Sequence, residues 1–392
     1  MTEQPRDESA RPGGVTPNAG TASGRALARP NAGSTPDRTR TTPCAGNTPD
    51  AACPTPSAGS APIVCFLTGA TAVGKSDVAL LLAERHGWEI VSVDSRQIYR
   101  RMEIGTAKPS AEETSRVRHH LLDLLDPNEV ASAGWFRERF LEAQADLASR
   151  GQKALAVGGT GLYWEAAIRG LHALPSASPE LRKELEAMVE REGLSAVFAR
   201  LAGRDPDGAA GIDRYNRHRV IRACELVELT GRTLQEIYSG AREGEQDPVP
   251  ASGSLPVAGD AAGDTVRSVT PPVVVLSRPR PVLRERIARR CEAMLEAGLL
   301  GEIRALLDSG VEPDAPGLRT VGYREFLPHL LGGAPLDECR SRFVIQTRQY
   351  AKRQETWFRN RLPHAVTIEI EEGESAEETS ARVDVALEVG HL

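Results

Sequence analysis

Short apolar runs alternate along this chain with longer stretches in which apolar and polar residues mix. Four runs stand out: Ile63–Leu67, Glu89–Val93, Ala154–Val157 and Pro272–Leu276. Short, unalternating apolar runs are typical of strands that are buried on both faces of a parallel sheet. Helical patterns such as Asp77–Ala83 separate them. The pattern therefore predicts an α/β fold, a doubly wound parallel sheet with helices on both faces.

Two longer segments combine helical spacing with many charges. In residues 179–230, apolar side chains such as Leu181 and Leu185 recur at helical intervals, which indicates core packing. Residues 282–361 are also mostly helical. Breaks are expected at residues 310–317 and 332–335.

The first apolar run leads into a glycine loop, Gly69–Ser76, which matches the phosphate-binding pattern G-x-x-x-x-G-K-[ST]. Glycines let backbone N–H groups converge on an anion, and the N-terminus of the following helix favours negative charge. Lys75 would neutralise a terminal phosphate and the Ser76 hydroxyl would hold Mg²⁺. A purely structural glycine turn is the alternative. The loop predicts a diphosphate or triphosphate site.

Composition divides the chain into regions. Residues 1–60 and 243–272 are rich in small and turn-forming residues and have little apolar surface to bury, so we expect them to be disordered. The expected organisation is a disordered arm at 1–60, a P-loop α/β core at 61–170, a helical insertion at 171–215, the rest of the core at 216–365 with the flexible insertion 243–272, and a loose acidic tail at 366–392.

Charge and cysteine content limit the class of protein. The 392 residues carry a net charge of −6, which argues against a uniformly basic protein but leaves room for a local basic groove. No run of eighteen apolar residues predicts a membrane span, and the N-terminus lacks the layout of a secretory signal. Six cysteines without a C-x-x-C pair suggest neither zinc nor disulfides, so we expect a cytoplasmic protein.

Polar residues follow two further strand ends. Asp94 comes directly after Glu89–Val93 and would hold Mg²⁺ through water or act as a base; a helix N-cap is the alternative. Three glycines in Gly158–Gly161 indicate close backbone approach, with packing alone as the alternative, and Thr160 would donate to phosphate or substrate. Because ligands bind beyond the carboxyl ends of parallel strands, these residues and the glycine loop should converge on one crevice.

Basic residues gather near the C-terminus. Arg340–Arg361 contains seven of them and a single acid, Glu355, with aromatic residues between them. This composition suits a phosphate backbone and unstacked bases, although an ordinary solvated helix face is the alternative. His119 and His120 are neighbours without a carboxylate cluster, so we expect structural contacts from them and no metal site.

Together these segments resemble the tRNA dimethylallyltransferase family, also called tRNA isopentenyltransferases, from about residue 62 to residue 363. No cysteine follows Cys339, so the bacterial form without a C-terminal zinc finger is expected. The phosphate loop alone is generic, whereas the ordered set of motifs is specific. The motifs are Thr68–Ser76, Asp94–Arg100, Ile104–Pro109, His119–Pro127, Val157–Tyr163, Asn216–Glu225, Gly322–Glu325, Thr347–Gln354 and Thr356–Arg359.

The resemblance implies a P-loop NTPase-like α/β fold with a helical insertion domain and a helical C-terminal part. It implies transfer of a dimethylallyl group from dimethylallyl diphosphate to N6 of the adenosine 3′-adjacent to the anticodon, with release of diphosphate and with Mg²⁺ as cofactor. The partners would be dimethylallyl diphosphate and the anticodon stem-loop of tRNA. We expect a monomer that does not bind membranes.

Residue by residue, the resemblance implies that Asp94 is the base and that Thr71 and Lys75 lie at the reacting centre, with Ser76 as the metal ligand. The implied diphosphate-binding set is Gly69, Ala70, Thr71, Ala72, Val73, Gly74, Lys75, Ser76 and Arg286. The implied tRNA-binding set is Asp94, Ser95, Arg96, Gln97, Thr160, His218, Arg219, Val220, Ile221, Arg222, Arg319, Thr320, Val321, Gly322, Tyr323, Arg324, Thr347, Arg348, Gln349, Tyr350, Ala351, Lys352, Arg353 and Gln354.

Two residues depart from the family pattern. Arg96 stands where a smaller or apolar residue is more common, and Trp164 stands where an aliphatic residue is usual. Three other functions remain open from the residues: a small-molecule kinase, an isopentenyltransferase acting on a free adenine nucleotide, and a tRNA-binding protein without catalysis. A kinase function would leave the basic segment Arg340–Arg361 unexplained, and an enzyme acting on a free nucleotide would have less need of that segment. The intact glycine loop argues against a protein that has lost catalysis.

Overall fold

The structure is a computed structural model that describes residues 62–170, 174–175, 178–243 and 271–389. The arm at 1–60, with Cys44 and Cys53, and nearly all of the stretch 243–272 lie outside the described residues. The four described cysteines, Cys65, Cys224, Cys291 and Cys339, are free and buried. Among the helices of the described ranges, none is both long and apolar enough to cross a membrane.

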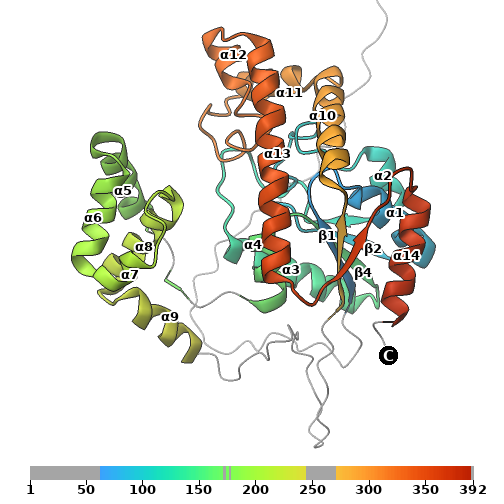
Figure 1. The fold of residues 1–392 in the computed structure, drawn as a ribbon, viewed down its shortest axis with the longest axis horizontal. Coiled ribbons are helices and arrows are strands. Elements are labelled where there is room, and N and C mark those ends of the chain that lie inside the picture. The colour runs from blue at the N-terminus through green and yellow to red at the C-terminus, as the bar shows by residue number, and fades with distance from the viewer. Residues whose placement is uncertain (1–61, 171–173, 176–177, 244–270, 390–392) are drawn as a thin grey trace, which may run out of the picture. The chain divides into compact units, whose positions relative to one another are not determined.

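Six strands form one parallel sheet in the order β3-β2-β4-β1-β5-β6 (Figure 1). Their bounds are β1 (Ile63–Gly69), β2 (Glu89–Ser92), β3 (His119–His120), β4 (Ala154–Gly158), β5 (Val273–Ser277) and β6 (Val366–Glu369). The four strands predicted from the apolar runs are confirmed. The short edge strands β3 and β6 were not predicted, because they have too few apolar residues to stand out.

Helices cover both faces of the sheet, as the expected doubly wound fold requires. In β1, Cys65 and Leu67 pack into one hydrophobic cluster and Phe66 packs into the other, because successive side chains of a strand point to opposite faces. Helices α1, α10 and α14 contribute to the first cluster, and α3 and α4 to the second. The helices outside the insertion are α1 (Lys75–His86), α2 (Ala111–Arg116), α3 (Ala133–Ser149), α4 (Gly161–Arg169), α10 (Arg280–Glu296), α11 (Leu299–Asp308), α12 (Leu327–Gly332), α13 (Leu336–Arg361) and α14 (Ala376–Val389).

Trp164, one of the two departures from the family pattern, belongs to the second cluster. Its side chain is fully buried, its ring centroid lies 4.6 Å from that of Phe66, and its indole N–H donates to the carbonyl of Gly158 at 3.3 Å. Trp164 therefore fills the core beneath α4 and does not face the ligand crevice.

The helical insertion is larger than expected. It comprises α5 (Pro179–Glu192), α6 (Leu194–Arg204), α7 (Pro206–Ala210), α8 (Arg217–Thr230) and α9 (Leu234–Glu243), which share a third hydrophobic cluster. Buried Glu225 of α8 accepts hydrogen bonds from Arg182 of α5 at 2.7 and 2.8 Å. The boundary predicted at residue 215 is wrong, because the apolar face of α8 completes this cluster.

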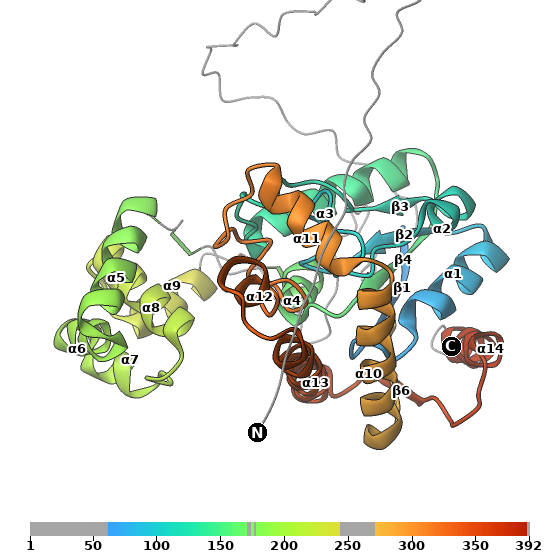
Figure 2. The same cartoon turned by 90° about the horizontal axis from the view of Figure 1, so that it is seen from above.

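The expected loose acidic tail is also wrong. Strand β6 pairs with β5 in parallel, and α14 packs beside α1 (Figure 2). On α14, Asp384 accepts hydrogen bonds from Arg85 and pairs with His86 at the end of α1. Val383 and Leu387 are buried, while charged residues such as Glu377, Glu378 and Glu388 are exposed.

Strand β4 ends at Gly158, where the backbone after the neighbouring strand β2 leaves no room for a side chain. A Cβ on Gly158 would overlap the carbonyl oxygen of Val93, which follows β2. We expect Gly158→Ala to lower the free energy of unfolding by about 2–4 kcal/mol, because the backbone must shift. A matched control is Gly203→Ala in α6, where a Cβ meets nothing within 4 Å. Thermal and denaturant unfolding compare the two; equal stability of both variants would contradict the expectation.

Candidate active site

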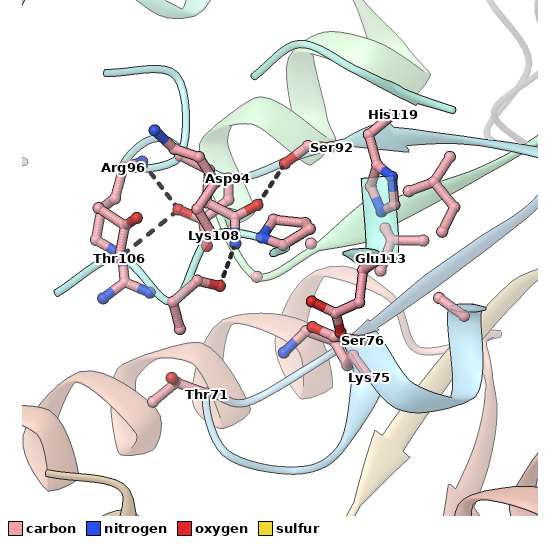
Figure 3. A pocket seen from close by; sticks show the side chains of 18 of the residues that line it. Thr71, Lys75, Ser76, Ser92, Asp94, Arg96, Thr106, Lys108, Glu113 and His119 are labelled. Carbon is pink, nitrogen blue, oxygen red and sulfur yellow. Dashed lines mark hydrogen bonds and ion pairs between the residues drawn. The ribbon is translucent and has the colours of Figure 1, made fainter. Parts of the chain in front are cut away.

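The carboxyl ends of three neighbouring strands, β2, β4 and β1, open into one cleft (Figure 3). Its walls include the glycine loop with Thr71, Lys75 and Ser76, then Asp94 after β2 and the glycine turn after β4. The cleft has about 830 Å³ of space, counted out to open solvent. The predicted convergence of these residues is confirmed.

The glycine loop has a strained backbone that its neighbours hold in place. Gly69 and Gly74 have φ values of 147° and 111°, and Ala72 adopts φ 64° without being glycine. The guanidinium Nε atoms of Arg278 and Arg286 donate to loop carbonyls, those of Val73 and Ala72, each at 2.9 Å. Arg286 therefore supports the loop from outside through its Nε.

Lys75 lies inside the loop. Its ammonium donates to the carbonyls of Gly69 at 2.9 Å and Ala70 at 2.8 Å. Burial, followed by the nearby charge of Arg290, lowers the pKa of Lys75 to about 7, although Asp94 opposes this shift. An anion bound in the loop would restore the usual pKa, because it compensates the buried charge.

Arg290 of α10 is the functional candidate that the sequence interpretation missed. It lines the cleft together with Lys75 and Asp94, and it also lines a second opening with Ser76, Arg286 and neighbouring residues. Burial and the charge of Arg96 lower the pKa of Arg290 to about 10. The available signal was its spacing, four residues beyond Arg286 and so on the same helix face.

Helix α13 is attached to the glycine loop and the glycine turn by one side chain. The Gln354 amide oxygen accepts from the Thr71 backbone N–H, and its NH₂ group donates to the Gly159 carbonyl, both at 2.8 Å. A Cβ on Gly159 would overlap Gln354, and one on Gly161 would overlap Trp357. Packing therefore explains the glycines of this turn. The buried Gln354 amide positions the loop and the turn, and its implied contact with tRNA stays a prediction.

Asp94 is tied to Arg96. Its Oδ1 atom accepts from the Arg96 backbone N–H at 2.9 Å and from the guanidinium Nε at 3.4 Å. Burial raises the pKa of Asp94, but the charge and hydrogen bonds of Arg96, with a contribution from Lys75, outweigh it and leave the pKa below its usual value. The carboxylate is therefore ionised at neutral pH. The N-cap alternative is not seen, since no helix begins at Asp94.

Hydrogen bonds also fix the residues around Asp94. Thr160 accepts from the Ser95 backbone N–H at 2.9 Å and lies 3.2 Å from the Ser95 hydroxyl. Gln97 accepts from the Ser92 hydroxyl at 2.9 Å and donates to the Ala107 carbonyl at 3.0 Å. Thr160 and Gln97 thus position the Asp94 segment, with Thr160 at the rim between β2 and β4.

The residues implied to bind tRNA divide into exposed and buried ones. Exposed side chains include His218 and Arg219 on α8, Arg319 and Arg324 before α12, and, on α13, Arg348, Gln349, Lys352 and Arg353. The side chains of Val220, Ile221, Val321, Tyr323 and Ala351 are buried in hydrophobic clusters, so they hold the segments that carry the exposed residues, and their implied tRNA contact stays a prediction. Tyr323 instead donates at 2.6 Å to Glu302, which accepts backbone N–H groups of residues 103–105.

The two histidines form β3 and do not lie on a helix. His120 pairs with Glu89, whereas His119 lines the inner end of the cleft, where burial lowers its pKa. No group of three or more potential metal ligands among His, Cys, Asp and Glu occurs in the described ranges. The expected structural role therefore fits His120, and His119 is a second cleft residue that sequence reasoning missed.

Comparisons with known proteins identify the family of this chain. Residues 97–361 match the family model described as IPP transferase, and residues 62–131 match one described as isopentenyl transferase. A tRNA dimethylallyltransferase of Methylococcus capsulatus is 43% identical over 297 residues, 76% of this chain and 89% of the relative. One of Bordetella avium is 42% identical over 326 residues, 83% of this chain and 96% of the relative.

Solved structures give the same picture. The crystal structure of a tRNA isopentenylpyrophosphate transferase from Bacillus halodurans matches with a TM-score of 0.56 and 32% identity, over 85% of this chain and 98% of that one. A eukaryotic dimethylallyltransferase acting on tRNA, 23% identical, shares the fold with a TM-score of 0.64. With one family model matched over residues 97–361 and relatives above 40% identity aligned over three quarters of its length, the chain belongs to the tRNA dimethylallyltransferase family.

Proposed function

We propose that this protein transfers a dimethylallyl group from dimethylallyl diphosphate to N6 of the adenosine 3′-adjacent to the anticodon of tRNA. The observation that carries the proposal is the single cleft in which the Asp94 carboxylate faces the same space as Lys75 and Arg290. A leaving diphosphate and a departing proton need cations and a base within reach of one reacting centre, and this cleft supplies both.

The donor side of the cleft would bind diphosphate. Lys75 and Arg290 line this side, and the N-terminus of α1, which has no side-chain cap, adds N–H groups without helical partners. As the allylic C–O bond breaks, its electron pair goes to the diphosphate oxygen. Fixed cations stabilise that growing negative charge more than they stabilise the intact donor, which lowers the barrier. The Thr71 hydroxyl lines the cleft beside this centre.

The residues at the second opening fit Mg²⁺. Ser76 is the second residue of α1, is exposed, and its hydroxyl has no hydrogen-bond partner in the described part of the chain. Because Mg²⁺ retains waters and takes few protein ligands beside substrate phosphates, one hydroxyl without a carboxylate cage suits it. Bound there, Mg²⁺ would neutralise charge on the diphosphate; Ser76 would hold it.

The acceptor side would bind the adenine. The N6 lone pair forms the new bond to the dimethylallyl carbon, and the nitrogen then carries a positive charge that makes its proton strongly acidic. Asp94, kept ionised by Arg96, takes that proton. A carboxylate with a lowered pKa is sufficient here, because the proton leaves only after the nitrogen has become cationic.

The surface of α13 favours RNA over a free nucleotide or a small kinase substrate. Arg348, Lys352, Arg353 and Arg359 are exposed, and among the described residues none of them has a carboxylate within ion-pairing distance. Unpaired cations on one helix, next to the cleft that contains Asp94, suit a phosphate backbone.

The direct test is incubation of purified protein with labelled dimethylallyl diphosphate and unmodified tRNA, followed by nucleoside analysis. Label in a free nucleotide, or ATP turnover without tRNA, would replace the proposal.

The double variant Lys352→Ala with Arg353→Ala should weaken tRNA binding. If each side chain contacts one phosphate, the slope of log affinity against log salt should fall in magnitude by about 1.4–1.8. Titrations at several salt concentrations measure it. Arg342→Ala is the matched control, because Arg342 is half-exposed on the same helix but paired with Glu338 at 2.7 Å. Unchanged salt slopes in the double variant would remove α13 from the tRNA interface.

A further inference from the structure

Arg96 is held next to Asp94 on two sides. Its Nε and backbone N–H both donate to Asp94 Oδ1, at 3.4 and 2.9 Å, as the dashed lines in Figure 3 show. Its guanidinium carbon lies 5.2 Å from the ring centroid of Tyr350 on α13. The Arg96 side chain is only 13% exposed. A planar group fixed at one edge and against one face has a defined orientation.

The remaining polar atoms of this pair are unused. Within the described residues, the two terminal nitrogens of Arg96 have no hydrogen-bond acceptor, and Asp94 Oδ2 has no donor. Both residues line the cleft. These atoms are open to the cleft, where a ligand can take the place of water on them. The site therefore offers a ligand one anionic acceptor with N–H donors beside it.

Diphosphate does not fit this pair. It needs donors only, and Lys75, Arg290 and the glycine loop supply them elsewhere in the cleft, whereas Asp94 Oδ2 would repel it. Adenine fits better. Each edge of adenine that carries the N6 amino group presents an N–H donor beside a ring-nitrogen acceptor, N1 on one edge and N7 on the other.

We propose that Asp94 and Arg96 read the acceptor base together: Asp94 Oδ2 accepts from N6–H, and a terminal N–H of Arg96 donates to the ring nitrogen on the same edge. This rests on the proposed function, with adenine N6 as the acceptor. Arg96 is then a positioning and specificity residue. It fixes the base so that N6 faces both the carboxylate and the dimethylallyl carbon. Guanine would place O6, an acceptor, against the Asp94 carboxylate and is rejected by repulsion.

Tyr350 lies between the Asp94–Arg96 pair and the exposed basic side of α13. Its ring contacts Arg96 on the cleft side and Arg353, at 5.9 Å, on the exposed side of α13. Arg353→Gln is therefore a matched control for Arg96→Gln. Both remove a guanidinium from the same aromatic ring, but only one removes it from Asp94.

The test compares anticodon stem-loop RNAs that carry adenosine, 1-deazaadenosine or 7-deazaadenosine at the target position. In the wild type, one of the two deaza substitutions should lower kcat/KM by about 10- to 100-fold, the cost of losing one arm of a bidentate contact. In Arg96→Gln the same substitution should cost little more than twofold. Any change in the intrinsic reactivity of N6 appears in both proteins and cancels in the ratio. Arg96→Lys, which keeps a charged donor of nearly the same reach, should restore part of the discrimination, since the glutamine NH₂ group ends two bonds short of the arginine nitrogens. Arg353→Gln should keep all of it.

Equilibrium binding of the same RNAs gives the ratios without turnover, should Arg96→Gln prove inactive, and thermal unfolding confirms that the variants are folded. Equal losses in wild type and Arg96→Gln for both deaza RNAs would overturn the proposal. If the wild type fails to modify the adenosine RNA at all, the proposed function itself is wrong. If the adenosine RNA is modified but the deaza bases lower kcat/KM equally in the wild type and in Arg96→Gln, only the role proposed for Arg96 is wrong.

Discussion

Asp94→Asn should lower kcat by about 10²- to 10⁴-fold, the usual contribution of a positioned base. Asparagine keeps the shape of the side chain and a carbonyl oxygen that still accepts from the two N–H groups of Arg96. It does not take a proton at neutral pH. Affinity for tRNA should change far less, because phosphate contacts supply most of it. Single-turnover transfer and tRNA titration measure the two effects separately.

A matched control is Asp337→Asn at the start of α13, where the carboxylate is 91% exposed and far less constrained than Asp94. It should behave as the wild type. Transfer at the wild-type rate by Asp94→Asn would show that another group, or water, takes the proton. Equal loss of tRNA binding and of transfer would indicate that Asp94 only holds the RNA.

Arg290→Gln should lower kcat/KM for dimethylallyl diphosphate by about 10²- to 10³-fold, as the loss of one donor to a developing anion does in other enzymes. The guanidinium lines both openings of the cleft beside Lys75, and the medium around it is largely protein, so its charge acts there with little screening. Calorimetric titration with diphosphate should show the same weakening without any RNA present.

Two neighbours on α10 serve as comparisons. Arg289→Gln removes a guanidinium at the exposed rim of the second opening that pairs with Glu285 at 3.7 Å, and it should weaken diphosphate binding far less than Arg290→Gln, because solvent screens it. Arg286→Gln removes the donor to the Ala72 carbonyl and should act by loosening the glycine loop, so that protein stability falls together with diphosphate affinity. If Arg290→Gln binds diphosphate normally and Arg286→Gln binds it much more weakly, Arg286 and not Arg290 contacts the diphosphate.

The sequence predicted the sheet and the meeting point of the site for reasons that are local. Buried parallel strands need unbroken apolar runs, and a glycine loop needs a strand before it and a helix after it. Once Asp94 and Gly158 were placed after strands, the geometry of a parallel sheet brought them to the same edge as Lys75. None of these steps required knowledge of a long-range side-chain contact.

The sequence predictions that were wrong concern segments whose position depends on how helices pack against each other. The amphipathic pattern of α8 shows that one face is buried but not against which partner, so the insertion was ended at residue 215 although α8 packs on α5 and α6. The same ambiguity affected the acidic C-terminal segment, whose few apolar residues suffice to dock on α1. Gln354 looks like one more polar residue of a basic helix, and only the fold shows it joined to Thr71 and Gly159.

The chain alone therefore determined its fold class, its phosphate loop, the acid beside that loop and its family, because these depend on residue order within short segments. Tertiary structure alone decided that Arg290 reaches the cleft while Arg286 supports the loop, and that Arg96 clasps Asp94 with its terminal nitrogens unpaired among the described residues. Neighbouring arginines on one helix have the same chemistry. Arg286 and Arg290 share one face of α10 and differ by about one turn along its axis. The packing of α10 against α13 and the sheet places the first beside the loop carbonyls and the second at the cleft.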